Sequence, residues 1–183
     1  MQITIKNQNE MTDFAGKIAN KIIENKLYND IFALSGDVGS GKTFFVSALI
    51  NQLAKFYYSL HNKQINEIRV LSPSFNLLYH YQIDMIEILH CDLYRLDKNN
   101  VKLYYELENI GLFEYIGNKL IFIEWAEIAK EFLPNNINKL NFEFYNSDQF
   151  FDINNNLNNT QQLDNNSDIR IITINDRLSN LII

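Results

Sequence analysis

The sequence predicts an α/β fold, in which helices cover a central sheet and an antiparallel hairpin lies near the C-terminus. Two short, unbroken apolar runs, Ile31–Ser35 and Leu120–Glu124, are typical of strands that are buried on both faces. A glycine-rich turn follows the first run and leads directly into a segment with helical apolar spacing. Near the end of the chain, Lys139–Tyr145 and Ile169–Ile174 alternate apolar and polar residues, which predicts a paired hairpin.

Length and composition indicate one globular domain over residues 1–183. A chain of 183 residues lies within the usual size of one domain, and its net charge of −6 argues against a protein that coats nucleic acid. We interpret an Asn-rich stretch, about 146–167, as a surface insert in this domain. The one cysteine, Cys91, excludes an internal disulfide. Because no apolar run is long enough for a membrane helix and no signal-peptide pattern follows Met1, we expect a cytoplasmic protein without a membrane segment.

The N-terminal half alternates strands and helices. Met1–Lys6 alternates apolar and polar residues and predicts a short edge strand. Glu10–Asn25 has apolar residues at helical spacing, which predicts an amphipathic helix. After the strand at Ile31–Ser35, a second helix is predicted from Lys42 to about Phe56. The order is therefore strand, glycine-rich turn, helix.

Three strands are predicted next, at Ile68–Leu71, Phe75–Ile83 and Ile86–Cys91. The stretch Tyr104–Ile116 is predicted to be helical, with a break at Gly111. After the buried strand that ends at Glu124, a short helix is expected over Ala126–Phe132, stopped by Leu133-Pro134.

The glycine-rich turn matches the phosphate-binding pattern G-x-x-x-x-G-K-[ST]. Its residues are Gly36, Asp37, Val38, Gly39, Ser40, Gly41, Lys42 and Thr43. Glycines let the backbone curl so that successive N–H groups face one phosphate chain, and the following helix points its positive end at the same anion. Lys42 can reach the β- and γ-phosphates, and the Thr43 hydroxyl can ligate Mg²⁺. The motif predicts binding of a nucleoside triphosphate by all eight residues.

Two acids at the ends of predicted strands complete a candidate metal site. Asp92 follows Ile86–Cys91, and Glu124 closes the strand that begins at Leu120. Either acid alone is explained as a cap of a strand end or of the next helix. Beside a phosphate-binding loop, however, ligands collect at the carboxyl edge of the sheet. Our hypothesis is that Glu124 holds Mg²⁺ directly or through water, while Asp92 completes the metal shell or orients the attacking water; with Lys42 these are the predicted catalytic residues.

Two nearby segments are open to more than one interpretation. His90 and Cys91 precede Asp92, but with a single cysteine and three histidines at unrelated spacing a zinc site is disfavoured, and His90 is expected to pack or hydrogen-bond locally. Ser72, Pro73 and Ser74 follow a predicted strand. They form either a switch-like loop, whose Ser74 hydroxyl senses the γ-phosphate, or a simple proline turn.

The remaining sequence features bear on which nucleotide is bound and on which reaction the protein catalyses. None of the Asn-Lys pairs in the chain is followed by the aspartate of a guanine-reading motif, which favours ATP over GTP. The chain has four arginines and no arginine-rich lid segment, so hydrolysis coupled to a conformational or assembly step fits better than transfer to a metabolite. Arg95 and Arg170 can contact phosphate or a partner, or form surface ion pairs.

Several stretches together resemble one family. They are Leu34–Thr43, Ser72–Phe75, His90–Leu96, Glu106–Gly111 and Ile123–Trp125. Their order and spacing, from about Glu10 to Tyr145 and again near Ile169, are similar to those of the bacterial tRNA threonylcarbamoyladenosine biosynthesis ATPase family, TsaE (formerly YjeE). Ser74 stands where that family usually has threonine, and Met11 aligns with a family threonine near the adenine.

The resemblance implies a P-loop NTPase three-layer fold with a mostly parallel central sheet. It further implies a weak Mg²⁺-dependent ATPase required for threonylcarbamoyl modification of adenosine 37 in tRNAs reading ANN codons. In the family this ATPase regulates or resets the complex of TsaB and TsaD, so tRNA is an indirect partner. Thr43 and Glu124 match the family's Mg²⁺ positions, Asp92 its essential acid, and Trp125 a residue beside the active site. The alternatives are a small-molecule or nucleotide kinase, and a nucleotide-gated binding module without turnover.

Overall fold

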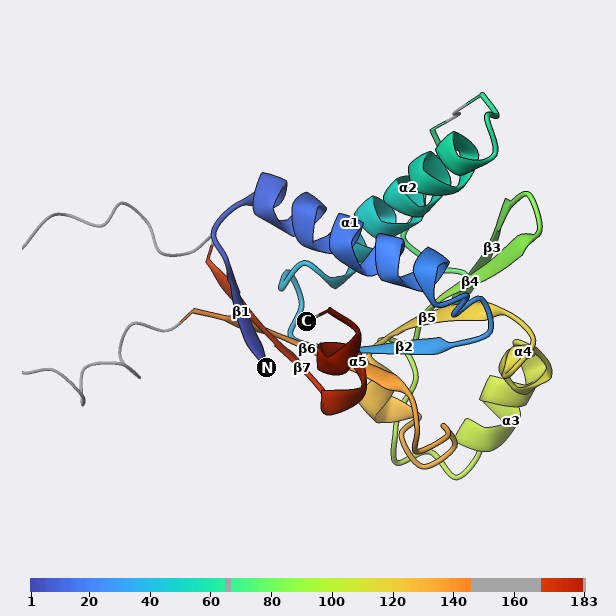
Figure 1. Ribbon diagram of the computed structural model, residues 1–183. Coiled ribbons are helices and arrows are strands. Elements are labelled where there is room, and N and C mark those ends of the chain that lie inside the picture. Colours follow the sequence, from blue (N-terminus) through green and yellow to red (C-terminus); the bar gives the residue numbers. More distant parts are fainter. Residues whose placement is uncertain (65–66, 146–168, 183) are drawn as a thin grey trace, which may run out of the picture.

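The computed structural model describes residues 1–64, 67–145 and 169–182. In chain order its elements are β1 (Gln2–Ile5), α1 (Gln8–Glu24), β2 (Ile31–Gly36), α2 (Lys42–Leu60), β3 (Leu78–Ile83), β4 (Ile86–Asp92), α3 (Leu103–Asn109), α4 (Leu112–Tyr115), β5 (Leu120–Glu124), the 3₁₀ turn η1 (Ala126–Ile128), β6 (Asn138–Phe144), β7 (Arg170–Ile174) and α5 (Asp176–Ile182). Figure 1 shows the strands running through the centre of the molecule.

The strands form one seven-stranded sheet in the order β1-β7-β6-β2-β5-β4-β3. The four central strands run parallel, because β2 pairs in parallel with both β5 and β6, and β4 pairs in parallel with β5. Both flanks are antiparallel: β3 returns against β4, and β7 lies between β6 and β1. The predicted mostly parallel sheet with a C-terminal antiparallel hairpin is therefore confirmed, and β1 is the predicted edge strand.

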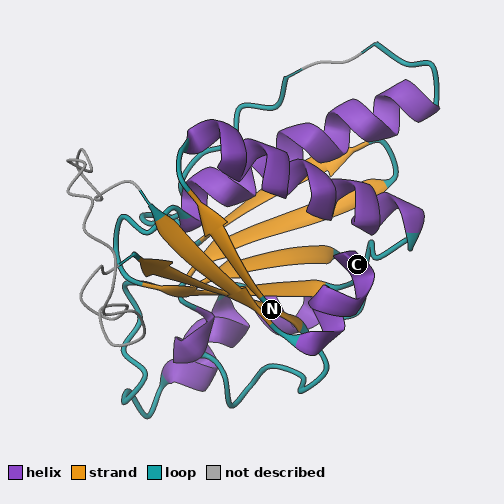
Figure 2. Ribbon diagram, turned by 60° about the vertical axis from the view of Figure 1, so that its left-hand side comes forward, coloured by secondary structure: helices purple, strands orange, loops and turns teal. Residues whose placement is uncertain are grey.

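Helices cover the two faces of the sheet unequally. The long helices α1 and α2 pack side by side on one face, where Phe32, Phe45 and Phe122 are fully buried. The short elements α3, α4 and η1 cover part of the opposite face, over β4, β5 and β2. Figure 2 shows the long helices above the sheet and short helices below it. This arrangement is the three-layer order expected from buried strands separated by helical segments.

Local sequence explains where the two long helices begin. Asn7 precedes α1, and its side-chain oxygen accepts a hydrogen bond from the Glu10 N–H at 2.9 Å, which caps the first turn. The Glu10 carboxylate in turn accepts a hydrogen bond from the Lys6 N–H at 2.8 Å. Helix α2 has no side-chain cap; it begins directly after Gly41, whose φ of 103° is in the left-handed region. Its first N–H groups are thus left free to face a ligand.

Three predicted elements differ from the structure. Ile68–Leu71 was expected to be a strand but is irregular, because the side chain of Asn51 satisfies both the N–H and the carbonyl of Ile68. The strand expected from Phe75 begins only at Leu78, after a turn closed by the Leu77 N–H on the Pro73 carbonyl. The helix expected over Ala126–Phe132 is the single 3₁₀ turn η1.

The predicted helix with a glycine break is confirmed, and one short helix was not predicted. The helix with a glycine break appears as α3 and α4, with Gly111 at a φ of 75° between them. The short helix α5 was not predicted; it packs against α1 through the buried Leu178. The Asn-rich stretch at 146–167 lies outside the described residues. None of the described helices has the length and apolar character needed to cross a membrane.

Candidate functional site

The sheet brings the predicted site residues to one edge. Strands β2, β4 and β5 are parallel neighbours that all end at this edge, and the register places Asp92 directly beside Glu124. Alternate residues of a strand point to the same face. Both acids therefore lie on the face that carries α2, at the end where that helix begins.

The turn after β2 needs glycine for steric reasons. Gly36, Gly39 and Gly41 have φ values of 128°, 78° and 103°, which residues with a Cβ atom rarely adopt. A Cβ atom on Gly36 would in addition overlap the backbone carbonyl oxygen of Phe142 in the neighbouring strand β6. The loop thus passes too close to β6 for a side chain at this position.

Lys42 is held inside its own loop. Its side chain is buried, with an exposed fraction of 4% for the residue. The ammonium Nζ donates to the carbonyls of Gly36 at 2.6 Å and Asp37 at 2.8 Å, and it lies 4.5 Å from the centre of the Trp125 ring. Burial lowers the pKa of Lys42, and the nearby carboxylate of Glu124 opposes this shift.

Thr43 and Glu124 are in direct contact, although 81 residues separate them in the chain. The Thr43 hydroxyl donates to Oε2 of Glu124 at 2.8 Å. The other carboxylate oxygen, Oε1, lies 2.8 Å from Nε2 of His90. His90 was expected to pack or hydrogen-bond locally, but its partner is one of the predicted site acids, 34 residues away in the chain. That partnership was not predicted.

Asp92 is tied to the loop predicted to act as a switch. The Ser74 hydroxyl donates to Oδ2 of Asp92 at 2.6 Å, and the hydroxyls of Ser72 and Ser74 lie 2.8 Å apart. The N–H of Tyr94 donates to Oδ1 of Asp92 at 3.0 Å, so both carboxylate oxygens have donors. The segment that begins Ser72-Pro73-Ser74 therefore reaches the site through one hydroxyl.

Two adjoining hollows lie beside the loop. The first, about 340 Å³, contains most of the predicted residues; its lining is Val38, Gly39, Gly41, Lys42, Thr43, Phe44, Ser74, Asp92, Tyr94, Glu124 and Trp125. The second, about 410 Å³, shares Gly39, Gly41 and Phe44 with it and is otherwise lined by Ile5, Asn7, Gln8, Met11, Ser40 and Arg170. The first hollow contains the two acids, and the second has apolar, amide and guanidinium groups but no acid.

The two predicted arginines occupy different places. Arg170 lies against the loop: its Nη2 donates to the Gly39 carbonyl at 3.4 Å, and its guanidinium lies 4.3 Å from the centre of the Phe144 ring. Arg95 lines neither hollow; its guanidinium faces the ring of Phe75, 5.9 Å from the ring centre. The structure thus brings Arg170 to the site and leaves Arg95 exposed outside both hollows.

Two aromatic side chains that line the first hollow, Phe44 and Tyr94, were not predicted. Phe44 follows Thr43 in α2, and Tyr94 packs on Trp125 with ring centres 5.0 Å apart. Both are partly exposed, so apolar periodicity gave no reason to assign them to the site. Their closeness in sequence to Thr43 and Asp92 was the available signal.

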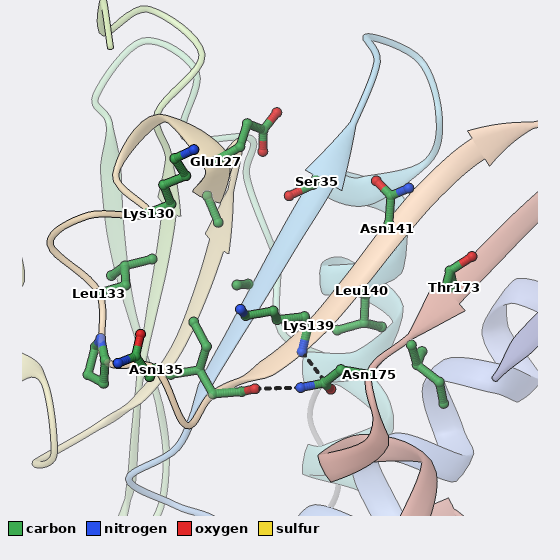
Figure 3. Close-up of a pocket in the computed structure, with 15 residues that line it drawn as sticks. Ser35, Glu127, Lys130, Leu133, Asn135, Lys139, Leu140, Asn141, Thr173 and Asn175 are labelled. Atoms are coloured by element: carbon green, nitrogen blue, oxygen red, sulfur yellow. Dashed lines mark hydrogen bonds between the residues drawn. The ribbon is translucent and has the colours of Figure 1, made fainter.

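A further hollow of about 410 Å³ lies elsewhere, on the sheet face away from α1 and α2. It is lined by parts of β2, β6, β7 and the segment around η1, and by none of the predicted site residues. Figure 3 shows Glu127 and Lys130 on one side of it and Lys139 and Asn175 on the other. There the Asn175 side chain donates to the Ile137 carbonyl and accepts from the Lys139 N–H.

The oxygen ligands at the first hollow suit a hard cation. Thr43, Asp92 and Glu124 present a hydroxyl and two carboxylates, the groups that Mg²⁺ prefers. No group of three or more His, Cys, Asp or Glu residues among the described ones is arranged to hold a metal ion alone.

Comparisons with known proteins identify relatives of this chain. The family model for the threonylcarbamoyl adenosine biosynthesis protein TsaE matches residues 5–150. The tRNA threonylcarbamoyladenosine biosynthesis protein TsaE of Rickettsia bellii (strain RML369-C) is 34% identical over 148 residues, which are 81% of this chain and 90% of the relative. The protein of the same name from Bacillus subtilis (strain 168) is 32% identical over 106 residues, 57% of this chain and 56% of the relative.

Among solved structures, the crystal structure of Bacillus subtilis YdiB is similar in fold. The TM-score is 0.59 at 19% sequence identity, over 99% of this chain and 90% of that one. This likeness confirms the predicted P-loop type of three-layer fold.

Proposed function

The chain belongs to the TsaE family of tRNA threonylcarbamoyladenosine biosynthesis, and from this premise we propose that it is a Mg²⁺-dependent ATPase of that pathway. The observation that carries the proposal is the convergence of Lys42, Thr43, Asp92 and Glu124 on one hollow at the start of α2. A main-chain cradle, an ammonium group, a hydroxyl and two carboxylates are the parts that phosphoryl transfer to water requires.

The two hollows suggest how ATP would lie. The triphosphate would bind along Gly36–Thr43, where loop N–H groups and Lys42 meet it. The base would enter the second hollow, which Ile5 and Met11 line with apolar atoms and Asn7 and Gln8 with amides. Met11, which aligns with a family threonine near the adenine, lines this hollow.

Glu124 and Asp92 would have different roles in the reaction. When bound, Mg²⁺ would neutralise charge on the phosphates, held by the Thr43 hydroxyl and by Glu124. Asp92, which already accepts two hydrogen bonds, would orient the attacking water. Ser74 would couple this acid to the exposed loop that carries Phe75, 85% exposed. A change of bonding at Asp92 would thereby be transmitted to the surface.

We further propose that the ATPase acts with TsaB and TsaD, the partners that the family resemblance implies, and resets their complex between rounds of tRNA modification. The test is reconstitution with TsaB, TsaD and tRNA. Wild type should sustain modification over many cycles and release phosphate, whereas Glu124→Ala should do neither. Phosphate transferred to an acceptor would indicate a kinase, and ATP binding without turnover in the full mixture would indicate a binding module.

Nucleotide binding can be measured on this protein alone, before reconstitution with TsaB, TsaD and tRNA. Calorimetry should detect binding of ATP in the presence of Mg²⁺, and weaker binding of GTP. If no adenine nucleotide binds with Mg²⁺ present, the proposed function is wrong.

A further inference from the structure

His90 is a fully buried polar residue for which the reaction proposed above has no role. Its side chain is 0% exposed and that of Glu124 is 3% exposed. Their contact, Nε2 to Oε1 at 2.8 Å, joins the middle of β4 to the end of β5. A buried polar group is costly unless it is hydrogen-bonded, so an apolar residue would be the simpler choice at this position.

The hydrogen-bond pattern fixes the tautomer of the ring. An ionised carboxylate only accepts hydrogen bonds, so Nε2 of His90 must carry the hydrogen that it donates to Glu124. The other ring nitrogen, Nδ1, is buried and has no hydrogen-bond partner among the described residues. A hydrogen on Nδ1 would be a buried donor without an acceptor. The ring therefore carries its hydrogen on Nε2.

The two oxygens of Glu124 consequently have separate tasks. His90 holds Oε1, which leaves Oε2 for Thr43 and the space where the nucleotide and its cation would bind. Because the Thr43 hydroxyl gives its hydrogen to Oε2, its lone pairs remain available to a cation. Without the bond from His90, the Glu124 carboxylate could rotate and lose this alignment.

We propose that His90 is a positioning residue that sets the orientation of Glu124 for Mg²⁺-nucleotide binding. This inference rests on the proposed function, because it concerns the same metal site. Hydrogen bonds from residues behind a metal ligand orient the ligand, and their removal typically lowers metal affinity or activity about 10–100-fold. The same range is expected here.

The test compares two amide substitutions. In His90→Gln the amide nitrogen reaches about as far as Nε2 and can still donate to Glu124, whereas the side chain in His90→Asn is too short. Calorimetry measures the affinity for ATP first with excess Mg²⁺ and then with a chelator. The ratio of the two affinities is the factor by which Mg²⁺ strengthens binding. His90→Asn should lower this factor about 10–100-fold and His90→Gln less than about threefold. Binding without Mg²⁺ should stay unchanged in both.

Cys91→Ala is the matched control, because it removes buried volume from the same strand on the opposite face of the sheet. It should lower stability without changing the Mg²⁺ factor. Equal losses in both His90 variants, or no loss in His90→Asn, would overturn the inference while leaving the proposed function intact. No Mg²⁺ effect in wild type would instead remove the proposed function, and this inference with it.

Nitrogen NMR of the histidine rings tests the inference without any substitution or ligand. The chain has only three histidines, so the His90 signals can be assigned by comparison with His90→Gln. They should show hydrogen on Nε2 and none on Nδ1. The reverse tautomer would contradict the donation to Glu124.

Discussion

The ammonium group of Lys42 lies 2.6 Å from the carbonyl oxygen of Gly36, six residues earlier in the same loop. The lysine thus closes the loop on itself, with a second bond to the Asp37 carbonyl. To bind a triphosphate, Lys42 must exchange these carbonyls for phosphate oxygens. The exchange is favourable because phosphate oxygens are charged and carbonyl oxygens are not.

Lys42→Ala should weaken ATP binding about 10–100-fold, since a hydrogen bond to a charged group is worth roughly 1.5–3 kcal/mol. The fold should persist, because the substitution also removes a buried charge. Calorimetry with Mg²⁺ present measures the affinity, and circular dichroism monitors the fold. Lys55→Ala, an exposed lysine of the same helix, is the control and should bind ATP as wild type does. Undiminished binding by Lys42→Ala would contradict the proposed role of the loop.

Asp92→Asn should lower the rate of ATP hydrolysis about 100-fold or more, with a much smaller effect on ATP affinity. The amide keeps the size of the side chain and can still accept one hydrogen bond, but it cannot orient water as a carboxylate does. Phosphate release in the presence of TsaB and TsaD is the measurement. Asp97→Asn, an exposed acid five residues later, should hydrolyse ATP at the wild-type rate. Parallel losses of affinity and rate would argue that Asp92 mainly binds the nucleotide.

Two glycine substitutions should have opposite effects on stability. Gly36→Ala should cost at least about 3 kcal/mol, because the new methyl group meets the Phe142 carbonyl and the backbone φ of 128° is strained for alanine. Gly16→Ala should add about 0.5–1 kcal/mol, since Gly16 is inside α1 and its nearest neighbour, Gln52, is 3.7 Å from the added atom. Urea unfolding of both variants checks the signs. A stable Gly36→Ala protein would show that the loop passes β6 less closely than described.

Asp84 provides a pH-dependent prediction away from the site. The hydrogen bond from Lys63 at 2.6 Å, and then that from the Tyr57 hydroxyl at 3.2 Å, lower the pKa of Asp84. A carboxyl with a lowered folded-state pKa stabilises the protein above its unfolded pKa of about 3.9, and this stabilisation is lost as the pH falls through the folded-state pKa.

Wild type should therefore be more stable than Asp84→Asn at pH 7, and the difference should shrink as the pH falls below about 4. Asn tolerates the left-handed backbone at this position, where φ is 52°, so the substitution isolates the charge. Thermal unfolding across this pH range measures the difference. A difference that stays constant down to pH 2 would mean that the ion pair contributes nothing.

The sequence predicted the parts of the site whose geometry is local. The loop from Gly36 to Thr43 could be recognised because its glycines and its Lys-Thr pair have one shared requirement, the close approach of the backbone to phosphate. The partnership of His90 with Glu124 depends instead on the register of β4 against β5, which no local pattern specifies. The spacing of His90 and Asp92 did contain a signal, since residues two apart on a strand share a face.

The fold was predicted where hydrophobic patterns were strong. It was missed where side chains hydrogen-bond to backbone N–H and carbonyl groups that a strand would otherwise pair. Ile68 has a strand-like sequence context but bonds to the Asn51 side chain, and the Leu71 N–H bonds to the Tyr81 hydroxyl at 3.0 Å. Such bonds between side chain and backbone arise only once α2 and β3 are in place. The helix α5 has seven residues, too few for its period to stand out.

The position of β1 has a consequence for the order of assembly during translation. Among the described strands β1 is the first to be synthesised, yet in the sheet it pairs with β7, which begins at Arg170. Its hydrogen-bonding edge must wait until β7 has been made. The first of the described strands is thus among the last to find its partner, and a chain that ends before β7 would expose an unpaired strand edge at which aggregation can begin.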